Sequence, residues 1–258
     1  MTLQHDWLYR PVRWVLRQLG FAYFRILASG LEHIPVDGPA ILAGNHPSVL
    51  DGILLLIVAP RRVRFLVAEE FYTHPYLRWL FKAMGCIEVY RTRTHNGDAL
   101  RAAVEALECG EVIGIFPEGT TAYGGRMEHI KRGVGLLALR TGAPVIPFGI
   151  TGTDAAYPTA ARVPRPISVG IAFCPAQAYA RAQEEPIPEP VLHPALEDLR
   201  EEILRAVRWS RVTYGDAPPV WQCKQLRVLL SAAMIVPLCA FLHATMNPSL
   251  DPADQTTR

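Results

Sequence analysis

The sequence lacks the cysteine spacing that zinc sites and disulfide frameworks require. Its five cysteines are odd in number, and no two of them form a C-x-x-C pair. Structural zinc ligands usually come in such close pairs, and small disulfide-stabilised domains use an even set. The sequence therefore predicts neither a zinc site nor a disulfide framework, and a reducing, cytosolic environment fits best.

The sequence also has little net charge and shows no pattern typical of a secretory leader. A formal charge of +2 over 258 residues gives no support for a nucleic-acid partner. Arginines at positions 10, 13, 17 and 25 interrupt the first thirty residues, so that no apolar signal segment forms there. Half of the residues are hydrophobic, which suits one sizeable domain but falls short of a protein with several membrane spans.

The N-terminal residues 1–30 are expected to form an amphipathic helix at the membrane interface. On a helix over residues 8–26, seven apolar side chains share one stripe, and Arg10, Arg13 and Arg17 lie opposite. An apolar stripe with a cationic back and nearby aromatic residues is typical of a helix that lies in an anionic bilayer surface. The alternative is a surface helix packed on its own domain.

The C-terminal residues 216–258 hold a second apolar segment and a polar tail. The apolar run over residues 228–242 is about fifteen residues long, whereas a membrane span needs about twenty. A re-entrant or interfacial helix is expected, with a buried core helix as the alternative. Together the two ends predict a peripheral or monotopic protein on the cytoplasmic face of the membrane.

The middle of the chain, residues 31–215, reads as one α/β domain. Short apolar runs predict strands over residues 39–44, 64–67, 86–90, 112–116, 145–150 and 167–173. Helical patterns intervene over residues 49–58, 98–108 and 132–139, and another follows a loop rich in Pro and Glu at 181–190. Such alternation predicts a mostly parallel sheet flanked by helices.

His46 and Asp51 are the candidate catalytic pair. His46 falls between a predicted strand and a predicted helix, and Pro47 favours a turn there. In such a turn Asp51 can accept from one ring nitrogen and leave the other nitrogen as a base. The chain has no G-x-S-x-G nucleophile elbow, and Ser48 fits a helix start. Direct deprotonation of a substrate hydroxyl is therefore favoured over a serine or cysteine nucleophile. The alternative class of enzyme is a thioesterase or lipase, against which the absent nucleophile elbow counts.

A second candidate segment comprises Phe116, Pro117, Glu118, Gly119 and Thr120. It follows the predicted strand at residues 112–116 and so falls at the carboxyl edge of the sheet, where open α/β sheets bind their ligands. Gly119 allows a close backbone approach, and Glu118 can anchor a hydroxyl or order the loop.

Four segments in order resemble the glycerolipid acyltransferase family, which includes the bacterial 1-acylglycerol-3-phosphate acyltransferases. They are N-H-P-S-V-L-D at 45–51, G-C-I-E-V-Y-R at 85–91, F-P-E-G-T at 116–120 and A-P-V-I-P-F at 143–148, with K-R-G at 131–133 between the last two. The resemblance covers residues 31–173. It implies His46 as general base with Asp51 as its partner, Arg91 on the acceptor's phosphate, an acceptor site shaped by Glu118 and Gly119, and a further cation at Lys131.

The resemblance implies an O-acyltransferase that moves a fatty acyl group from acyl-CoA or acyl carrier protein to a (lyso)glycerophospholipid such as 1-acylglycerol-3-phosphate. Its partners would be membrane lipids and the acyl donor, and no metal or redox cofactor is implied. One departure is Thr121, which stands where related sequences usually carry arginine. A non-phosphate lipid alcohol or glycolipid is thus an alternative acceptor, and a non-catalytic lipid-binding homologue is the alternative from another class.

Overall fold

The computed structural model describes residues 6–73, 75–90, 97–121, 127, 129–158, 161 and 163–215. Its helices are α1 Asp6–Tyr23, α2 Leu50–Val58, α3 Pro75–Met84, α4 Gly97–Glu108, α5 Arg132–Thr141, α6 Thr153–Ala156 and α7 Glu189–Tyr214, with 3-10 turns at Leu31–His33 and Glu69–Tyr72. Its strands are β1 Arg25–Ser29, β2 Ala40–Gly44, β3 Val63–Ala68, β4 Ile87–Val89, β5 Val112–Ile115, β6 Val145–Thr151 and β7 Ser168–Phe173.

The strands form one mixed, mostly parallel sheet in the order β1-β7-β6-β2-β5-β3-β4. Five of its strand pairs are parallel, and β6 with β7 is the antiparallel pair. The central strand β2 is buried along its whole length, as expected for a strand covered on both faces. The predicted parallel α/β class is confirmed, and all six predicted strands are present with ends shifted by at most one residue.

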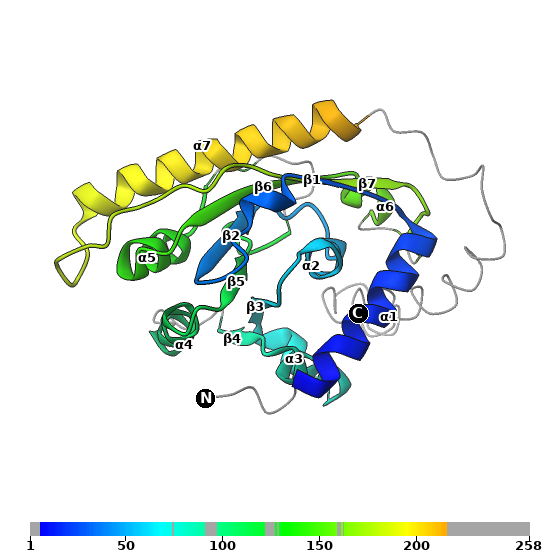
Figure 1. Ribbon diagram of the computed structural model, residues 1–258, viewed down its shortest axis with the longest axis horizontal. Helices are drawn as coiled ribbons and strands as arrows, with labels where there is room; N and C mark the ends of the chain where they lie inside the picture. Colours follow the sequence, from blue (N-terminus) through cyan, green and yellow to red (C-terminus); the bar gives the residue numbers. More distant parts are fainter. Residues whose placement is uncertain are drawn as a thin grey trace, which may run out of the picture.

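Helices cover both faces of the sheet (Figure 1). One apolar core lies between the sheet and α4, α5 and α7, and the other lies between the sheet and α1, α2 and α6. The long helix α7 packs mainly along β6 and β7. This layering leaves the carboxyl ends of β6, β2 and β5 side by side at one edge of the sheet, because these three strands are parallel neighbours.

The N-terminal segment departs from the expected helix over residues 8–26. Helix α1 ends at Tyr23, and Arg25–Ser29 form the edge strand β1, which pairs with β7. The sheet therefore begins before residue 31. Strand β1 is short and only partly buried, so its sequence carries little of the alternation that marks a strand. Helix α3 was also missed by the sequence analysis.

The apolar stripe of α1 faces the domain rather than away from it. Val12, Leu16 and Leu19 pack against the core on α2, and the Arg13 guanidinium donates to the backbone oxygens of Leu56 and Ala59 at the end of α2. This matches the alternative of a helix packed on its own domain. No helix in the described part of the chain is both long and apolar enough to cross a bilayer. The apolar run at 228–242 lies outside the described residues.

Candidate active site

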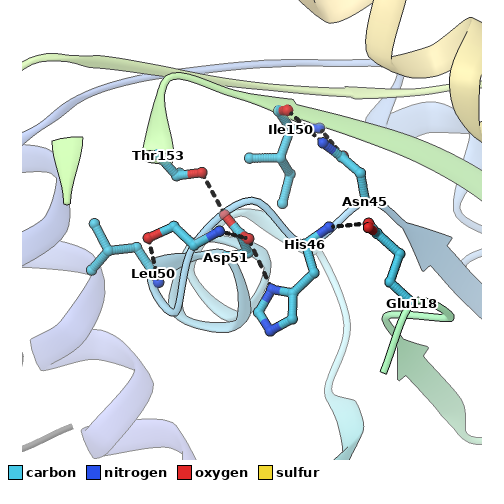
Figure 2. Close-up of polar contacts among 8 residues, drawn as sticks. Asn45, His46, Leu50, Asp51, Glu118, Ile150 and Thr153 are labelled. Atoms are coloured by element: carbon cyan, nitrogen blue, oxygen red, sulfur yellow. Dashed lines mark hydrogen bonds and ion pairs between the residues drawn. The ribbon is translucent and has the colours of Figure 1, made fainter. Parts of the chain in front are cut away.

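The candidate catalytic pair, His46 and Asp51, lies in the turn that joins β2 to α2. The His46 Nδ1 atom is 2.9 Å from Asp51 Oδ2, and Figure 2 shows the imidazole folded back over the first turn of α2. A carboxylate can only accept, so Nδ1 carries the proton and Nε2 keeps its lone pair. The predicted contact between His46 and Asp51 is thereby confirmed. It leaves the Nε2 lone pair available to accept a proton.

Local backbone geometry explains why the turn closes at this point. The Ser48 amide donates to Asp51 Oδ2 at 2.7 Å, and the Asp51 amide bonds to the Ser48 carbonyl at 3.1 Å. Ser48 is buried, and its hydroxyl accepts from the Leu50 amide. Ser48 thus serves the start of the helix, as expected, and is not placed as a nucleophile.

Long-range contacts fix the same turn from two neighbouring strands. Asn45 exchanges two hydrogen bonds with the Ile150 backbone on β6, at 2.7 and 3.0 Å. The Glu118 carboxylate accepts the His46 amide at 2.9 Å from the loop after β5. Just before the turn, a side chain at Gly44 would lie 2.2 Å from the Phe148 ring, so this position requires glycine. Figure 2 shows Ile150 of β6 and Glu118 of the loop after β5 reaching the turn from different elements.

A third side chain, Thr153, contacts the pair from α6. Its Oγ1 lies 2.6 Å from Asp51 Oδ1. The sequence analysis missed this residue, because 102 positions separate it from Asp51 and no local pattern marks it. We call the set of His46, Ser48, Asp51, Glu118 and Thr153 the polar corner.

Burial changes the acidity of both carboxyl groups in the polar corner. Asp51 is fully buried, which raises its pKa, while hydrogen bonds from His46, Thr153 and Ser48 oppose the rise. Burial likewise raises the pKa of Glu118, and the bond from the His46 amide lowers it. The donors around Asp51 therefore favour the ionised form that the partner of a histidine base needs.

A large cavity opens beside His46. Its volume is about 970 Å³, at the upper end of small-molecule pockets. Its walls are mainly apolar side chains from α1, α2, β3, α3 and α4, and we call it the apolar pocket. His46 is one of its few ionisable lining residues, and the imidazole stacks on Phe116 with 4.2 Å between ring centres. His46 thus borders a space suited to an alkyl chain.

The predicted segment at residues 116–120 lies at the same border. Phe116, Pro117, Gly119 and Thr120 all line the apolar pocket. Gly119 has a φ of +72°, and a Cβ there would lie 2.3 Å from the Lys131 ammonium nitrogen. The left-handed φ favours glycine at this position, whereas the flexible Lys131 side chain could move aside.

The predicted cations are only partly described. Lys131 lines the pocket beside Gly119, and within the described ranges no carboxylate pairs with its ammonium group. Arg132 also lines the pocket but forms an ion pair with Glu189. Arg91 lies outside the described residues, so its expected contact with a phosphate stays a prediction. Across those same residues, no cluster of His, Cys, Asp or Glu could hold a metal ion.

A histidine–carboxylate pair thus lies beside an apolar pocket at the carboxyl edge of parallel strands, which is where open α/β sheets bind their ligands. Comparison with known proteins shows a similarity to one family. Residues 25–151, about half of the chain, match the acyltransferase family model.

Named relatives agree with this match. The chain is 31% identical over 141 residues to the chloroplastic 1-acyl-sn-glycerol-3-phosphate acyltransferase of Arabidopsis thaliana, covering 54% of this chain and 39% of the relative. A protein of the same name from Borreliella burgdorferi is 29% identical over 137 residues, covering 53% and 55%. The chain thus spans about two-fifths to one half of the length of these relatives.

A solved structure shares the fold. The crystal structure of the 1-acyl-sn-glycerophosphate acyltransferase from Thermotoga maritima aligns with a TM-score of 0.64 and 24% identity, covering 81% of this chain and 80% of the other. At this identity the likeness establishes a common α/β architecture.

Proposed function

We propose that this chain is an O-acyltransferase that moves a fatty acyl group from acyl-CoA or acyl carrier protein to the hydroxyl of a (lyso)glycerophospholipid such as 1-acylglycerol-3-phosphate. The observation that carries the proposal is the His46–Asp51 pair at the border of the apolar pocket. The matched family and the relatives named as acyltransferases support it.

In the proposed step, His46 Nε2 takes the proton of the acceptor hydroxyl as its oxygen attacks the thioester carbonyl. The tetrahedral intermediate collapses, the carbon–sulfur bond breaks, and the imidazolium returns its proton to the thiolate. The products are an ester and a free thiol. Asp51 stays ionised throughout and stabilises the imidazolium, which is the usual role of a carboxylate behind a histidine base.

The apolar pocket would hold an acyl chain during this step. Burying each methylene group contributes about 0.8 kcal/mol, so a fatty chain supplies much of the binding energy without any polar contact. The thioester carbon would then lie near His46, which is half-buried at the border of the pocket. No resident cofactor takes part in this scheme.

The acceptor's head group is the least constrained feature. Lys131 offers a cation beside Gly119 that pairs with no carboxylate among the described residues, which suits a phosphate, and Arg91 is proposed to add a second cation. Thr121 also lines the pocket and leaves a neutral side chain where related sequences usually carry arginine. That residue favours the second candidate, a non-phosphate lipid alcohol or glycolipid.

The function is tested by incubating the protein with labelled acyl-CoA or labelled acyl carrier protein and a panel of acceptors. The panel contains 1-acylglycerol-3-phosphate, other lysophospholipids, a monoacylglycerol and a glycolipid, and the labelled products are separated and identified by mass spectrometry. Label in a phospholipid supports the main proposal, and label in a neutral lipid supports the second. No labelled acceptor, with or without release of free fatty acid, would contradict both.

We further propose that the protein binds the cytoplasmic face of the membrane as a peripheral or monotopic protein. Trp14 and Phe21 on α1 and Trp79 on α3 are exposed, and Arg17 lies over the Phe21 ring. Both helices also line the apolar pocket, and exposed aromatic residues with arginines favour the surface of an anionic bilayer.

Co-sedimentation with anionic phospholipid vesicles tests this placement. Trp14→Ser combined with Phe21→Ser should weaken vesicle binding about tenfold, since two partly inserted aromatic side chains are lost. Trp209→Ser on α7, where the tryptophan is equally exposed, is the matched control and should bind as the wild type does. Equal losses in both proteins would argue against a bilayer surface at α1.

A further inference from the structure

Thr153 is the one member of the polar corner that neither the sequence motifs nor the proposed chemistry assigns a role. It is the first residue of α6 and lies two residues after the end of β6. Its side chain is 1% exposed, and Oγ1 lies 2.6 Å from Asp51 Oδ1. Figure 2 shows the hydroxyl directed at the carboxylate from the side opposite the imidazole. A short contact of this kind between two fully buried groups indicates a specific pairing.

The direction of this hydrogen bond follows from the acceptor. An ionised carboxylate only accepts, so the Thr153 hydroxyl donates. Asp51 Oδ2 receives both the His46 ring N–H and the Ser48 amide, whereas Oδ1 receives Thr153. Without the hydroxyl, Oδ1 would be a buried acceptor that has lost its donor, and the carboxylate could rotate towards another partner.

Two features of the fold fix the position of Thr153: the backbone conformation of Gly152 and the hydrogen bonds between Asn45 and Ile150. Gly152, between β6 and α6, has a φ of +84°, and a Cβ there would lie 2.7 Å from the Ser168 carbonyl oxygen. The paired hydrogen bonds between Asn45 and Ile150 tie the end of β2 to β6 three residues earlier. The two strand ends that supply His46 and Thr153 are therefore held in register.

We propose that Thr153 is a positioning residue for the His46–Asp51 pair. Its hydroxyl holds Asp51 in the rotamer that receives the His46 Nδ1–H, and this keeps Nε2 free to act as the base. Thr153 neither loses nor gains a proton in the step; its O–H stays on Asp51 while the imidazolium forms and decays. The inference rests on the proposed acyl transfer and extends it by one residue.

Thr153→Val keeps the size and branching of the side chain and removes the donor. We expect kcat to fall about 10- to 100-fold, in line with the loss of one hydrogen bond to a charged group, with little change in KM for donor or acceptor. Thr153→Ser restores the hydroxyl and should recover most of the rate. A purely structural role would not give this split between kcat and KM together with rescue by serine.

The pH–rate profile gives a second readout. Loss of the Thr153 donor makes the pair bind its proton more tightly, so the acidic limb of the Thr153→Val profile should move to higher pH. Among the described residues, the titratable side chains around this carboxylate are His46, Glu118 across the turn, and Asp154 next to Thr153 in α6. All three are the same in the wild type and in Thr153→Val, so a shift reports on the missing hydroxyl.

Two measurements separate this inference from the function on which it rests. If the wild type transfers no acyl group, the proposed function fails. If the wild type is active and Thr153→Val keeps kcat within twofold, the inference fails alone. Thr151→Val removes a hydroxyl that bonds Ser210 at 3.0 Å and is the matched control, with wild-type kcat expected.

A readout that needs no turnover is ¹⁵N NMR of the His46 imidazole. The wild type should show one tautomer with the proton on Nδ1, and Thr153→Val should show a mixture; an unchanged spectrum would overturn the inference. Thermal unfolding of each variant checks that it is folded, and Thr153→Ala takes the place of the valine variant if the latter is not.

Discussion

Asp51 and Gly52 are neighbours in α2, yet they belong to two regions with opposite properties. Asp51 is in the polar corner, fully buried, with three donors on its carboxylate. Gly52 lines the apolar pocket, and a Cβ built on it meets no heavy atom within 4 Å. The comparison shows that one helix contributes to two different sites. The polar corner holds its atoms in fixed positions, which proton transfer requires, and the apolar pocket leaves unfilled space, which an alkyl chain requires.

The polar corner should lose its catalytic activity when a single charge in it is removed. Asp51→Asn keeps the shape but cannot accept all three hydrogen bonds, so His46 loses its defined tautomer. We expect acyl transfer to fall about 10²- to 10⁴-fold, the range of general-base catalysis. Initial rates at saturating substrates measure the effect.

The control for Asp51→Asn is Asp98→Asn, which alters an exposed carboxylate on α4 paired with Arg101. That protein should keep the wild-type rate. Circular dichroism should show that both variants are folded. An Asp51→Asn enzyme with more than a tenth of the wild-type rate would remove the distinction between the two regions.

The apolar pocket should tolerate substitution but change its selectivity. Gly52→Leu places a branched side chain in the open space of the pocket that His46 also lines, so long acyl donors should lose at least about tenfold in kcat/KM relative to short donors. Gly52→Ala should give a smaller change in the same direction. Competition between labelled donors of different chain lengths measures the ratio. A uniform loss for all lengths would show that the pocket does not hold the acyl chain.

Cysteine reactivity gives the mildest test of the apolar pocket. Burial raises the pKa of the Cys86 thiol to about 12, whereas Cys109 is exposed. A thiolate is the reactive form, so at pH 8 iodoacetamide should label Cys109 and leave Cys86 largely unmodified, as peptide mass spectrometry would show. Denaturant should make both reactive. Equal labelling of the native protein would contradict an apolar environment that keeps the Cys86 thiol protonated.

The same pKa gives a direction for stability. The Cys86 pKa is raised above its ordinary value of 9.0, so the folded state holds the thiol proton more tightly than the unfolded state does. Its contribution to the free energy of unfolding is fully present below pH 9 and is lost as the pH rises towards 12. The labelling experiment at pH 8 is thus carried out where this contribution is intact.

The sequence predicted those parts of the site that depend on short-range geometry. His46 and Asp51 are five positions apart around a proline turn, and Phe116–Thr120 follows a strongly apolar strand, so local rules suffice for both. Thr153 and Asn45 depend on how β6 lies beside β2, which no local pattern encodes. Their contacts could be known only once the strand order was known.

The fold was predictable for similar reasons, but the prediction was wrong at the edge of the sheet formed by β1. The buried parallel strands read as continuous apolar runs, so their positions were clear. Strand β1 at the sheet edge is only five residues long and partly exposed, and its first two residues fall within the helix predicted over residues 8–26. The stripe on α1 was visible in the sequence, but its direction was not, because a bilayer and a domain core select the same side chains.

The central claim is that His46 is the base that activates the acceptor hydroxyl. The most direct test compares thiol release and lipid product from wild type, His46→Ala and the exposed-histidine control His193→Ala. We expect the His46→Ala protein to be folded and to form product at no more than about one hundredth of the wild-type rate, with His193→Ala unchanged. Product formation by His46→Ala at near the wild-type rate would contradict the claim.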